Sequence, residues 1–190
     1  MTDFRRRGMK NKEFYSPLPK IMVMTMLLGI VGCLFFGILY FLQKLAWQLS
    51  VAVTCGVTAY HILIRFMSPV ILQCIFHRHY NCRAWWFQQR KWEPVLYRLL
   101  KVKNWKGKAM TYDPSEFSFK VHSPEEIVNN MCHAEVVHEL IVLLSFTSLF
   151  FSIPFGAFPA FLITAIMAAT FDLTFVMIQR YNRPRVMRLI

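Results

Sequence analysis

The chain has 190 residues, of which 56% are hydrophobic, and it carries 22 Lys and Arg against 10 Asp and Glu, a formal net charge of +12 at pH 7. So high an apolar content, including 18 Phe and 11 Met, exceeds what the core of a soluble domain needs, so composition excludes an ordinary soluble protein and predicts an integral membrane protein. The five cysteines show no CxxC spacing, which argues against a disulfide framework or a zinc ribbon.

The first 20 residues carry six basic side chains ahead of an apolar run over residues 21–42. A basic start of this kind can mark a secretory signal, but the run is 22 residues long and lacks a small-residue cleavage site, so we expect a retained membrane span. Glycines within the run would let a neighbouring helix approach closely. The basic residues are Arg5, Arg6, Arg7, Lys10, Lys12 and Lys20, and the glycines are Gly29, Gly32 and Gly37.

A second, less regular span is predicted over residues 47–74, in which His61 and Arg65 lie one helical turn apart. It is followed by a hydrophilic segment, residues 75–126, that is rich in Trp and in basic residues. Trp favours the membrane interface and basic side chains favour anionic headgroups, so we expect this segment to lie on the cytoplasmic membrane surface. Residues 94–103 within it have the pattern of a short amphipathic interfacial helix.

The third span has a clearly marked start. Ser123 at the N-cap, Pro124 at the first helical position and Glu126 at the third form a capping box, and the helix is predicted to continue unbroken over residues 127–153. A fourth span is predicted over residues 159–180. These patterns predict an all-α polytopic protein, a single membrane domain with four transmembrane helices and an interfacial segment between the second and the third.

Nearly all of the basic residues fall in three places: six before the first span, ten between the second and third spans, and four after Gln179. Because Lys and Arg in short loops stay on the cytoplasmic side, this distribution predicts a multi-pass protein of the cell membrane with both termini in the cytoplasm. Topology already accounts for the positive charge, so we expect membrane lipids rather than nucleic acid as partners.

Ionisable side chains inside predicted spans indicate a structural or functional role, because inserting each into the membrane costs about 2.5 to 3.5 kcal/mol of free energy on insertion scales. The predicted topology places five of them at a similar depth near the cytoplasmic leaflet: Arg65, Glu135, His138, Glu139 and Asp172. A structural interpretation is that Arg65 pairs with Glu139 or Asp172 in a supporting polar network that holds the helices together.

For Glu135 and His138 we favour a catalytic interpretation. Glu135, His138 and Glu139 share one helical face, and a carboxylate beside an imidazole is the arrangement that a general base needs. A metal site is not predicted, because His133 and His138 are five residues apart and point in different directions on a helix.

Three sequence features together resemble the glycosyl-4,4'-diaponeurosporenoate acyltransferase family over about residues 97–188. They are the tail Gln179-Arg180-Tyr181-Asn182-Arg183-Pro184-Arg185, the pattern Ala134-Glu135-x-x-His138, and Trp105-Lys106-x-Lys108. The resemblance implies a membrane enzyme that esterifies a sugar hydroxyl of a carotenoid glycoside, or of another glycolipid, with a fatty acyl chain.

The resemblance also implies a role for each group of residues. His138 is expected to remove the proton of the acceptor hydroxyl while Glu135 orients the imidazole. The donor is expected to be an acyl thioester, acyl-coenzyme A or an acyl carrier protein, used as a substrate without any further cofactor. Its phosphates are expected to bind to basic and polar residues that include arginines, which suit phosphate geometry: Trp105, Lys106, Lys108, Arg180, Asn182, Arg183 and Arg185.

Two other functions remain open from the residues alone. One is a non-catalytic lipid-binding or assembly protein whose intramembrane polar network is purely structural. The other is a membrane oxidoreductase or metalloenzyme that uses the histidines.

Overall fold

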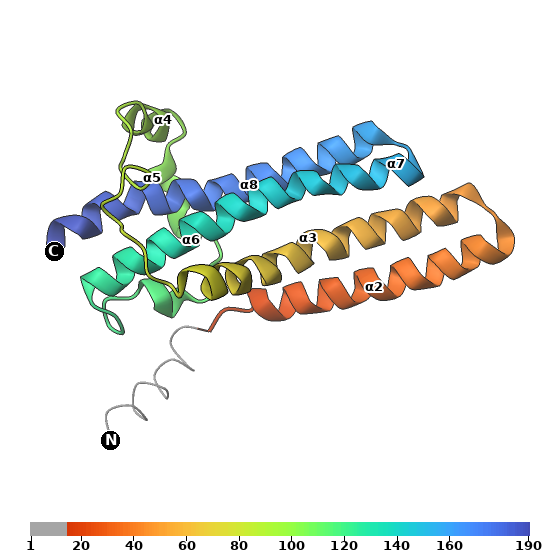
Figure 1. Cartoon of the computed structure of the whole chain (residues 1–190), viewed down its shortest axis with the longest axis horizontal. Coiled ribbons are helices and arrows are strands. Elements are labelled where there is room, and N and C mark those ends of the chain that lie inside the picture. Colours follow the sequence, from red (N-terminus) through yellow and green to blue (C-terminus); the bar gives the residue numbers. More distant parts are fainter. Residues whose placement is uncertain (1–14) are drawn as a thin grey trace, which may run out of the picture. The chain divides into compact units, whose positions relative to one another are not determined.

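The structure is a computed structural model that describes residues 15–190 (Figure 1). The N-terminal basic residues predicted to face the cytoplasm, Arg5 to Lys12, lie outside these residues. The regular elements within residues 15–190 are all helical and no strand occurs among them, which confirms the predicted all-α class. Four helical segments are long and apolar enough to cross a membrane, so the chain is a multi-pass membrane protein.

The four apolar segments extend slightly beyond the predicted spans. Helix α2 covers Leu18–Gln43 and α3 covers Ala46–Phe76. The third segment begins with α6, Pro124–Ser145, and the fourth is α8, Phe158–Val186. Helix α8 therefore continues past the predicted end of its span and carries the arginine-rich tail on helical turns.

The residues divide into two compact units. The helical unit comprises Pro19–Ile71 and Leu140–Asp172, and the site unit comprises Leu72–Glu139 and Leu173–Ile190 with the described residues up to Leu18. Helices α3, α6 and α8 each pass from one unit into the other along the chain. Arg65 on α3 and Asp172 on α8 belong to the helical unit, whereas Glu135, His138 and the arginine-rich tail belong to the site unit.

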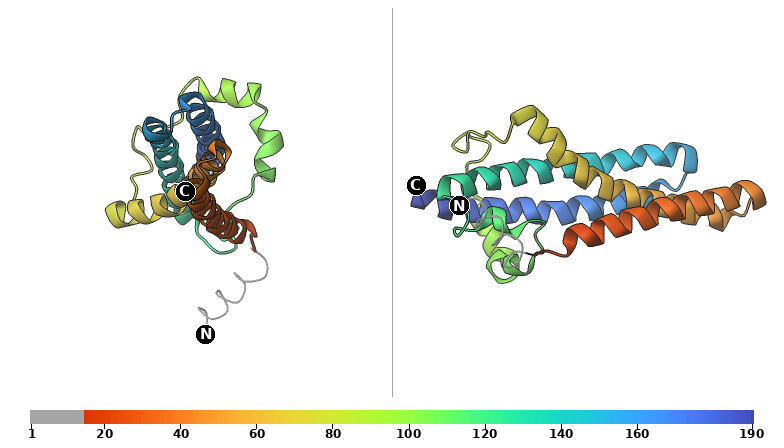
Figure 2. Two further views of the ribbon diagram at one scale, coloured as in Figure 1. Left: turned by 90° about the vertical axis from the view of Figure 1, so that its right-hand side faces the viewer. Right: turned by 90° about the horizontal axis from the view of Figure 1, so that it is seen from below.

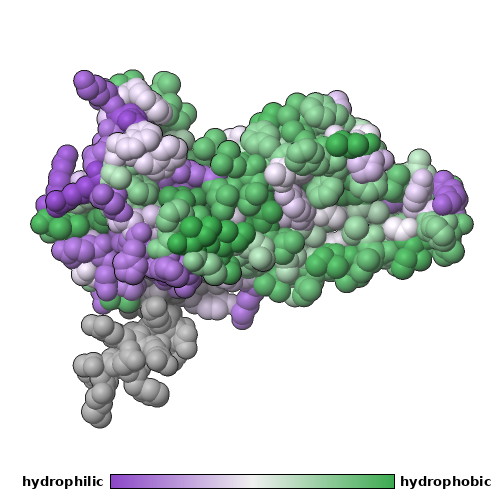
Figure 3. All heavy atoms as spheres, in the orientation of Figure 1, coloured by the Kyte–Doolittle hydropathy of each residue, from purple (hydrophilic) through white to green (hydrophobic). Residues whose placement is uncertain are grey.

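Within the helical unit, α2 and α3 form an antiparallel hairpin (Figures 1 and 2). The hairpin is close-packed where the sequence predicted it, because a Cβ atom added to Gly29 would lie 2.9 Å from the carbonyl oxygen of Cys55. Gly37 has no such neighbour within 4 Å. Apolar side chains cover the outer surface of the hairpin (Figure 3), as expected for helices that face lipid.

The third segment differs from the prediction of an unbroken α-helix. Helix α6 ends at Ser145 and is followed by a 3₁₀ turn, Phe146–Phe151, and by the short helix α7, Ser152–Phe155. The hydroxyls of Ser145, Thr147, Ser148 and Ser152 each donate to a carbonyl three or four residues earlier, which favours a tightened turn. Pro154 lies within α7, which ends with Gly156 as its C-cap.

The connecting segment also differs from the prediction, since the single amphipathic helix expected over residues 94–103 is divided in two. Helix α4 covers Glu93–Leu99 and α5 covers Val102–Trp105, and Lys101 between them has a left-handed backbone with φ of +49°. The capping box of α6 is confirmed: Ser123 N–H donates to Glu126 Oε2 at 2.9 Å, and Glu126 N–H donates to Ser123 Oγ at 3.3 Å.

Candidate functional site

Two arginines and two glutamates form a buried charge cluster in the site unit. Arg180 and Arg183 lie one turn apart on α8, Glu135 faces them from α6, and Glu93 begins α4. We call these four residues the arginine clamp. The clamp contains two positive and two negative charges, so it is electrically balanced.

Arg180 uses every N–H group of its guanidinium. Its Nε and NH2 groups donate to Glu93 at 3.1 and 2.5 Å, and its NH1 group donates to Glu135 at 2.6 Å. The remaining hydrogens donate to the carbonyl oxygens of Trp86 at 3.0 Å and Gln88 at 2.9 Å. Because a guanidinium has five N–H donors, Arg180 has none left for a ligand.

Arg183 and Glu135 form the innermost pair of the clamp. Arg183 is 1% exposed and Glu135 is 0% exposed. Arg183 donates to the second carboxylate oxygen of Glu135 and to the carbonyl oxygen of Phe87, and its guanidinium lies 5.1 Å from the centre of the Phe87 ring. Both oxygens of Glu135 therefore accept from arginines, and Arg183 holds the backbone around Phe87 against α6 and α8.

Glu93 is a site residue that sequence analysis missed. It is 2% exposed, and it also accepts a hydrogen bond of 2.6 Å from the hydroxyl of Tyr97, one turn later on α4. Burial alone would raise the pKa of Glu93, but the hydrogen bonds from Arg180 and Tyr97 outweigh it and hold the pKa below its usual value. Burial and the bond to Glu93 raise the pKa of Tyr97. In the sequence, Glu93 before Pro94 is indistinguishable from an ordinary acidic helix start.

His138 and Glu139 lie beside the clamp and are both partly exposed. The imidazole of His138 stacks on the ring of Phe175 from α8, with centroids 4.7 Å apart and an interplanar angle of 11°. Glu139 accepts a hydrogen bond of 3.0 Å from the indole N–H of Trp86. Of the helical face predicted to be catalytic, Glu135 is thus inside the clamp, whereas His138 lies outside it and is partly exposed.

Arg65 and Asp172 form an ion pair within the helical unit, in which Asp172 is buried and Arg65 is partly buried. Arg65 donates to Asp172 and also to the carbonyl oxygen of His61, one turn earlier on α3. The pair joins α3 to the first half of α8. A second link comes from the hydroxyl of Tyr60, which donates to the carbonyl oxygen of Leu144 at 3.3 Å.

Residues predicted to bind the donor form a second group in the site unit, around Tyr181. Lys106 donates to Asn182 Oδ1 at 2.5 Å and lies 4.8 Å from the centre of the Tyr181 ring. The guanidinium of Arg185 lies 3.8 Å from the same centre. Burial, and then the positive charges of Arg185 and Lys103, lower the pKa of Lys106. We call Lys103, Lys106, Asn182 and Arg185 the basic cluster.

The other predicted donor-binding residues lie differently. The indole N–H of Trp105 donates to the carbonyl oxygen of Leu100 at 2.9 Å and so closes the turn between α4 and α5. Lys108 is exposed at the end of the following 3₁₀ turn. Arg180 and Arg183 belong to the clamp.

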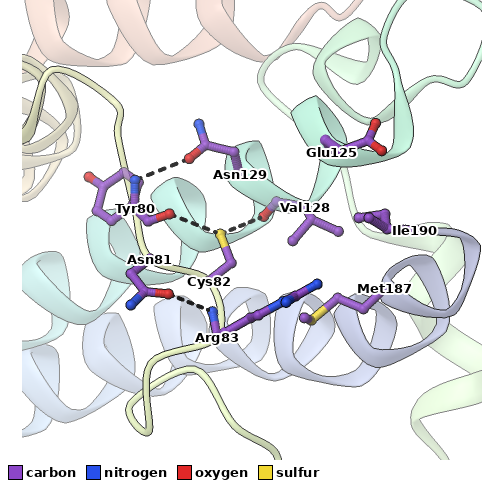
Figure 4. A pocket seen from close by; sticks show the side chains of 9 residues that line it. All are labelled: Tyr80, Asn81, Cys82, Arg83, Glu125, Val128, Asn129, Met187 and Ile190. Atoms are coloured by element: carbon purple, nitrogen blue, oxygen red, sulfur yellow. Dashed lines mark hydrogen bonds between the residues drawn. The ribbon is translucent and has the colours of Figure 1, made fainter.

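The site unit also contains a pocket of about 300 Å³ between the start of α6, the end of α8 and the segment after α3 (Figure 4). The thiol of Cys82 lies in its wall, 3.6 Å from the carbonyl oxygen of Tyr80 and 3.8 Å from that of Val128. Asn129 accepts from the backbone N–H of Tyr80 at 3.2 Å. Asn81, Cys82 and Asn129 thus bind backbone groups of the pocket wall, and the side chains of Arg83 and Glu125 also line the pocket.

Comparison with known proteins identifies the family of the chain. The family model for glycosyl-4,4'-diaponeurosporenoate acyltransferase matches residues 83–190, which include the whole arginine clamp, His138 and the basic cluster. No curated protein and no solved structure matches the chain. The match covers more than half of the chain and favours an acyltransferase over a non-catalytic module or a metalloenzyme. The chain therefore belongs to the glycosyl-4,4'-diaponeurosporenoate acyltransferase family and is a membrane acyltransferase.

Proposed function

We propose that the protein moves a fatty acyl group from a thioester to a sugar hydroxyl of a glycosylated carotenoid or a related glycolipid. In this reaction the hydroxyl oxygen attacks the thioester carbonyl carbon, the new C–O ester bond forms, and the C–S bond breaks. The hydroxyl proton ends on the sulfur of the released carrier. The protein must therefore supply a base for that proton, hold the carrier, and admit a lipid-soluble acceptor.

His138 is the base in this proposal. The observation that carries it is an imidazole that is partly exposed and stacked on Phe175, one helical turn after the buried carboxylate of Glu135 on α6. An imidazole can accept the hydroxyl proton near neutral pH and return it to the leaving thiolate. Stacking limits the rotation of the ring, which keeps its nitrogens in a constant direction.

Glu135 acts as a positioning residue rather than by proton transfer. Both of its oxygens accept from arginines, so its carboxylate is anchored to α8. Because Glu135 and His138 are three residues apart on α6, anchoring Glu135 also fixes the helical turn that carries the base. Glu93 supports this arrangement through Arg180.

The donor is held by the residues that the clamp leaves available. Arg180 and Arg183 are occupied by carboxylates and backbone carbonyls, and the indole N–H of Trp105 by the carbonyl oxygen of Leu100. The predicted set is thereby reduced to Lys106, Lys108, Asn182 and Arg185. Basic residues on this side of the chain also fit the orientation expected from the sequence, in which the site unit faces the cytoplasm at the cell membrane. An acyl-coenzyme A or an acyl carrier protein would approach from that side.

The test is acyl transfer by the purified full chain in lipid nanodiscs, with a glycosylated carotenoid acid as acceptor and acyl-coenzyme A or acyl carrier protein as donor. His138→Gln should lower kcat by about 10²- to 10⁴-fold, since general-base catalysis contributes that much. Its elution profile in size-exclusion chromatography should match that of the wild type. His79→Gln, at an exposed histidine of the same unit, is the matched control and should keep wild-type turnover. Turnover by His138→Gln close to that of the control would discard the general-base assignment.

A further inference from the structure

The site unit contains two groups of cations with opposite charge balance. In the arginine clamp, Arg180 and Arg183 are matched by Glu93 and Glu135. In the basic cluster, no carboxylate among residues 15–190 forms an ion pair with Lys103, Lys106 or Arg185. Three positive side chains are therefore gathered on one short stretch of surface without a counter-charge.

The basic cluster is held together by a neutral residue, Tyr181. Lys106 and Arg185 both lie over its ring, at 4.8 and 3.8 Å from the centre. The ring is itself fixed edge-on against Tyr97, with centroids 5.5 Å apart and an angle of 80°. Tyr97 in turn donates to Glu93 of the clamp, so the aromatic platform under the cations is anchored to buried structure.

The positive charges of the cluster repel one another. Burial contributes most to the lowered pKa of Lys106, and the charges of Arg185 and Lys103 add to it. An anion bound between them would remove this repulsion and would be favoured for the same reason. The free cluster is thus preorganised for a ligand that carries negative charge.

The donor groups of the cluster suit a phosphate in particular. Asn182 accepts from Lys106 through Oδ1, which directs its amide Nδ2 hydrogens away as two further donors. The NH1 group of Arg185 donates to the carbonyl oxygen of Tyr181, which leaves the Nε and NH2 groups of its guanidinium as donors. Lys106 and Lys103 add ammonium groups. Guanidinium, ammonium and amide donors all suit the oxygens of a phosphate.

We infer, on the basis of the proposed function, that the basic cluster binds the phosphate ester on the carrier of the acyl donor. Both candidate carriers, coenzyme A and an acyl carrier protein, attach the acyl chain through a pantetheine arm that ends in a phosphate ester. The chemistry recognised by the cluster is therefore common to both. A lipid headgroup is the competing source of the same anion.

The experiment measures binding without turnover. Coenzyme A and 4'-phosphopantetheine, neither of them acylated, are titrated calorimetrically into the full chain in nanodiscs of phosphatidylcholine. Lys106→Gln and Arg185→Gln should each raise Kd about tenfold, because each removes a charge-assisted hydrogen bond. Arg98→Gln removes one charge from an exposed arginine on α4 and should leave Kd within about twofold of wild type.

Separate outcomes decide this inference and the proposed function. His138→Gln should bind coenzyme A like wild type although its turnover is strongly reduced, so loss of catalysis does not count against the phosphate site. Equal Kd values for Lys106→Gln, Arg185→Gln and Arg98→Gln would overturn the site. A second outcome would also overturn it. In that outcome, Lys106→Gln and Arg185→Gln bind coenzyme A normally, and their binding or activity no longer responds to added phosphatidylglycerol. The anion bound by the cluster would then be a lipid headgroup.

Discussion

The arginine clamp makes a direct prediction for Glu135→Gln, which removes a charge but keeps the volume of the side chain. Arg183 is 1% exposed, and its other acceptor is the carbonyl oxygen of Phe87, so water cannot replace the lost carboxylate. Removing one partner of a buried ion pair costs about 3 to 5 kcal/mol. At roughly 2 to 4 °C per kcal/mol for a chain of this size, the midpoint of thermal unfolding should fall by about 6 to 20 °C.

The assay is thermal unfolding followed by Trp fluorescence, in one detergent at constant lipid content. Glu139→Gln is the matched control, since it removes the same charge four residues later on α6 from a partly exposed carboxylate with a hydrogen bond from Trp86. Its cost should be about 1 kcal/mol or less. If the two variants unfold within about 2 °C of each other, the clamp does not stabilise the site unit and the argument from burial is wrong.

This prediction also changes which variant tests catalysis. If Glu135 were a catalytic carboxylate, as the sequence indicates, the Glu135→Gln protein would be folded but inactive. The structure predicts that this variant loses stability together with activity, because its carboxylate holds two arginines. His138→Gln is the diagnostic substitution, since His138 lies outside the clamp.

Three further predictions concern single positions. The pKa of Glu93 is lowered in the folded protein, so its contribution to the free energy of unfolding should be complete above pH about 5. That contribution should be lost as the pH falls through the pKa of the folded state. Glu93→Gln should therefore reduce the loss of stability at acid pH in a curve of unfolding free energy against pH. Gly29→Ala should destabilise the α2–α3 hairpin by about 1 to 3 kcal/mol in chemical denaturation, because its Cβ would lie 2.9 Å from the Cys55 carbonyl oxygen. Gly37→Ala is the control and should be neutral or slightly stabilising. Neither ring nitrogen of buried His61 has a hydrogen-bond partner within residues 15–190, so His61→Leu should raise the unfolding midpoint, and a lower midpoint would contradict this account.

The order of helices and their starts could be predicted from the sequence because both depend on neighbours along the chain. Apolar run length alone predicts four spans, and the Ser123 capping box depends on contacts three residues apart. The close approach at Gly29 was also predictable, since a small residue in an apolar helix permits it. The prediction of an unbroken third helix was wrong, because a run of Ser and Thr hydroxyls after α6 competes for the backbone carbonyls.

The partners of the charged residues were decided only by tertiary structure. Spacing along α6 associated Glu135 with His138, but arginines 45 and 48 residues away bind both of its oxygens. Glu93, 87 residues from Arg180, carried no local signal at all. Local periodicity shows which face of a helix a side chain occupies, whereas the pairing of buried charges depends on which distant groups can replace the lost water, and that is determined by how the chain packs.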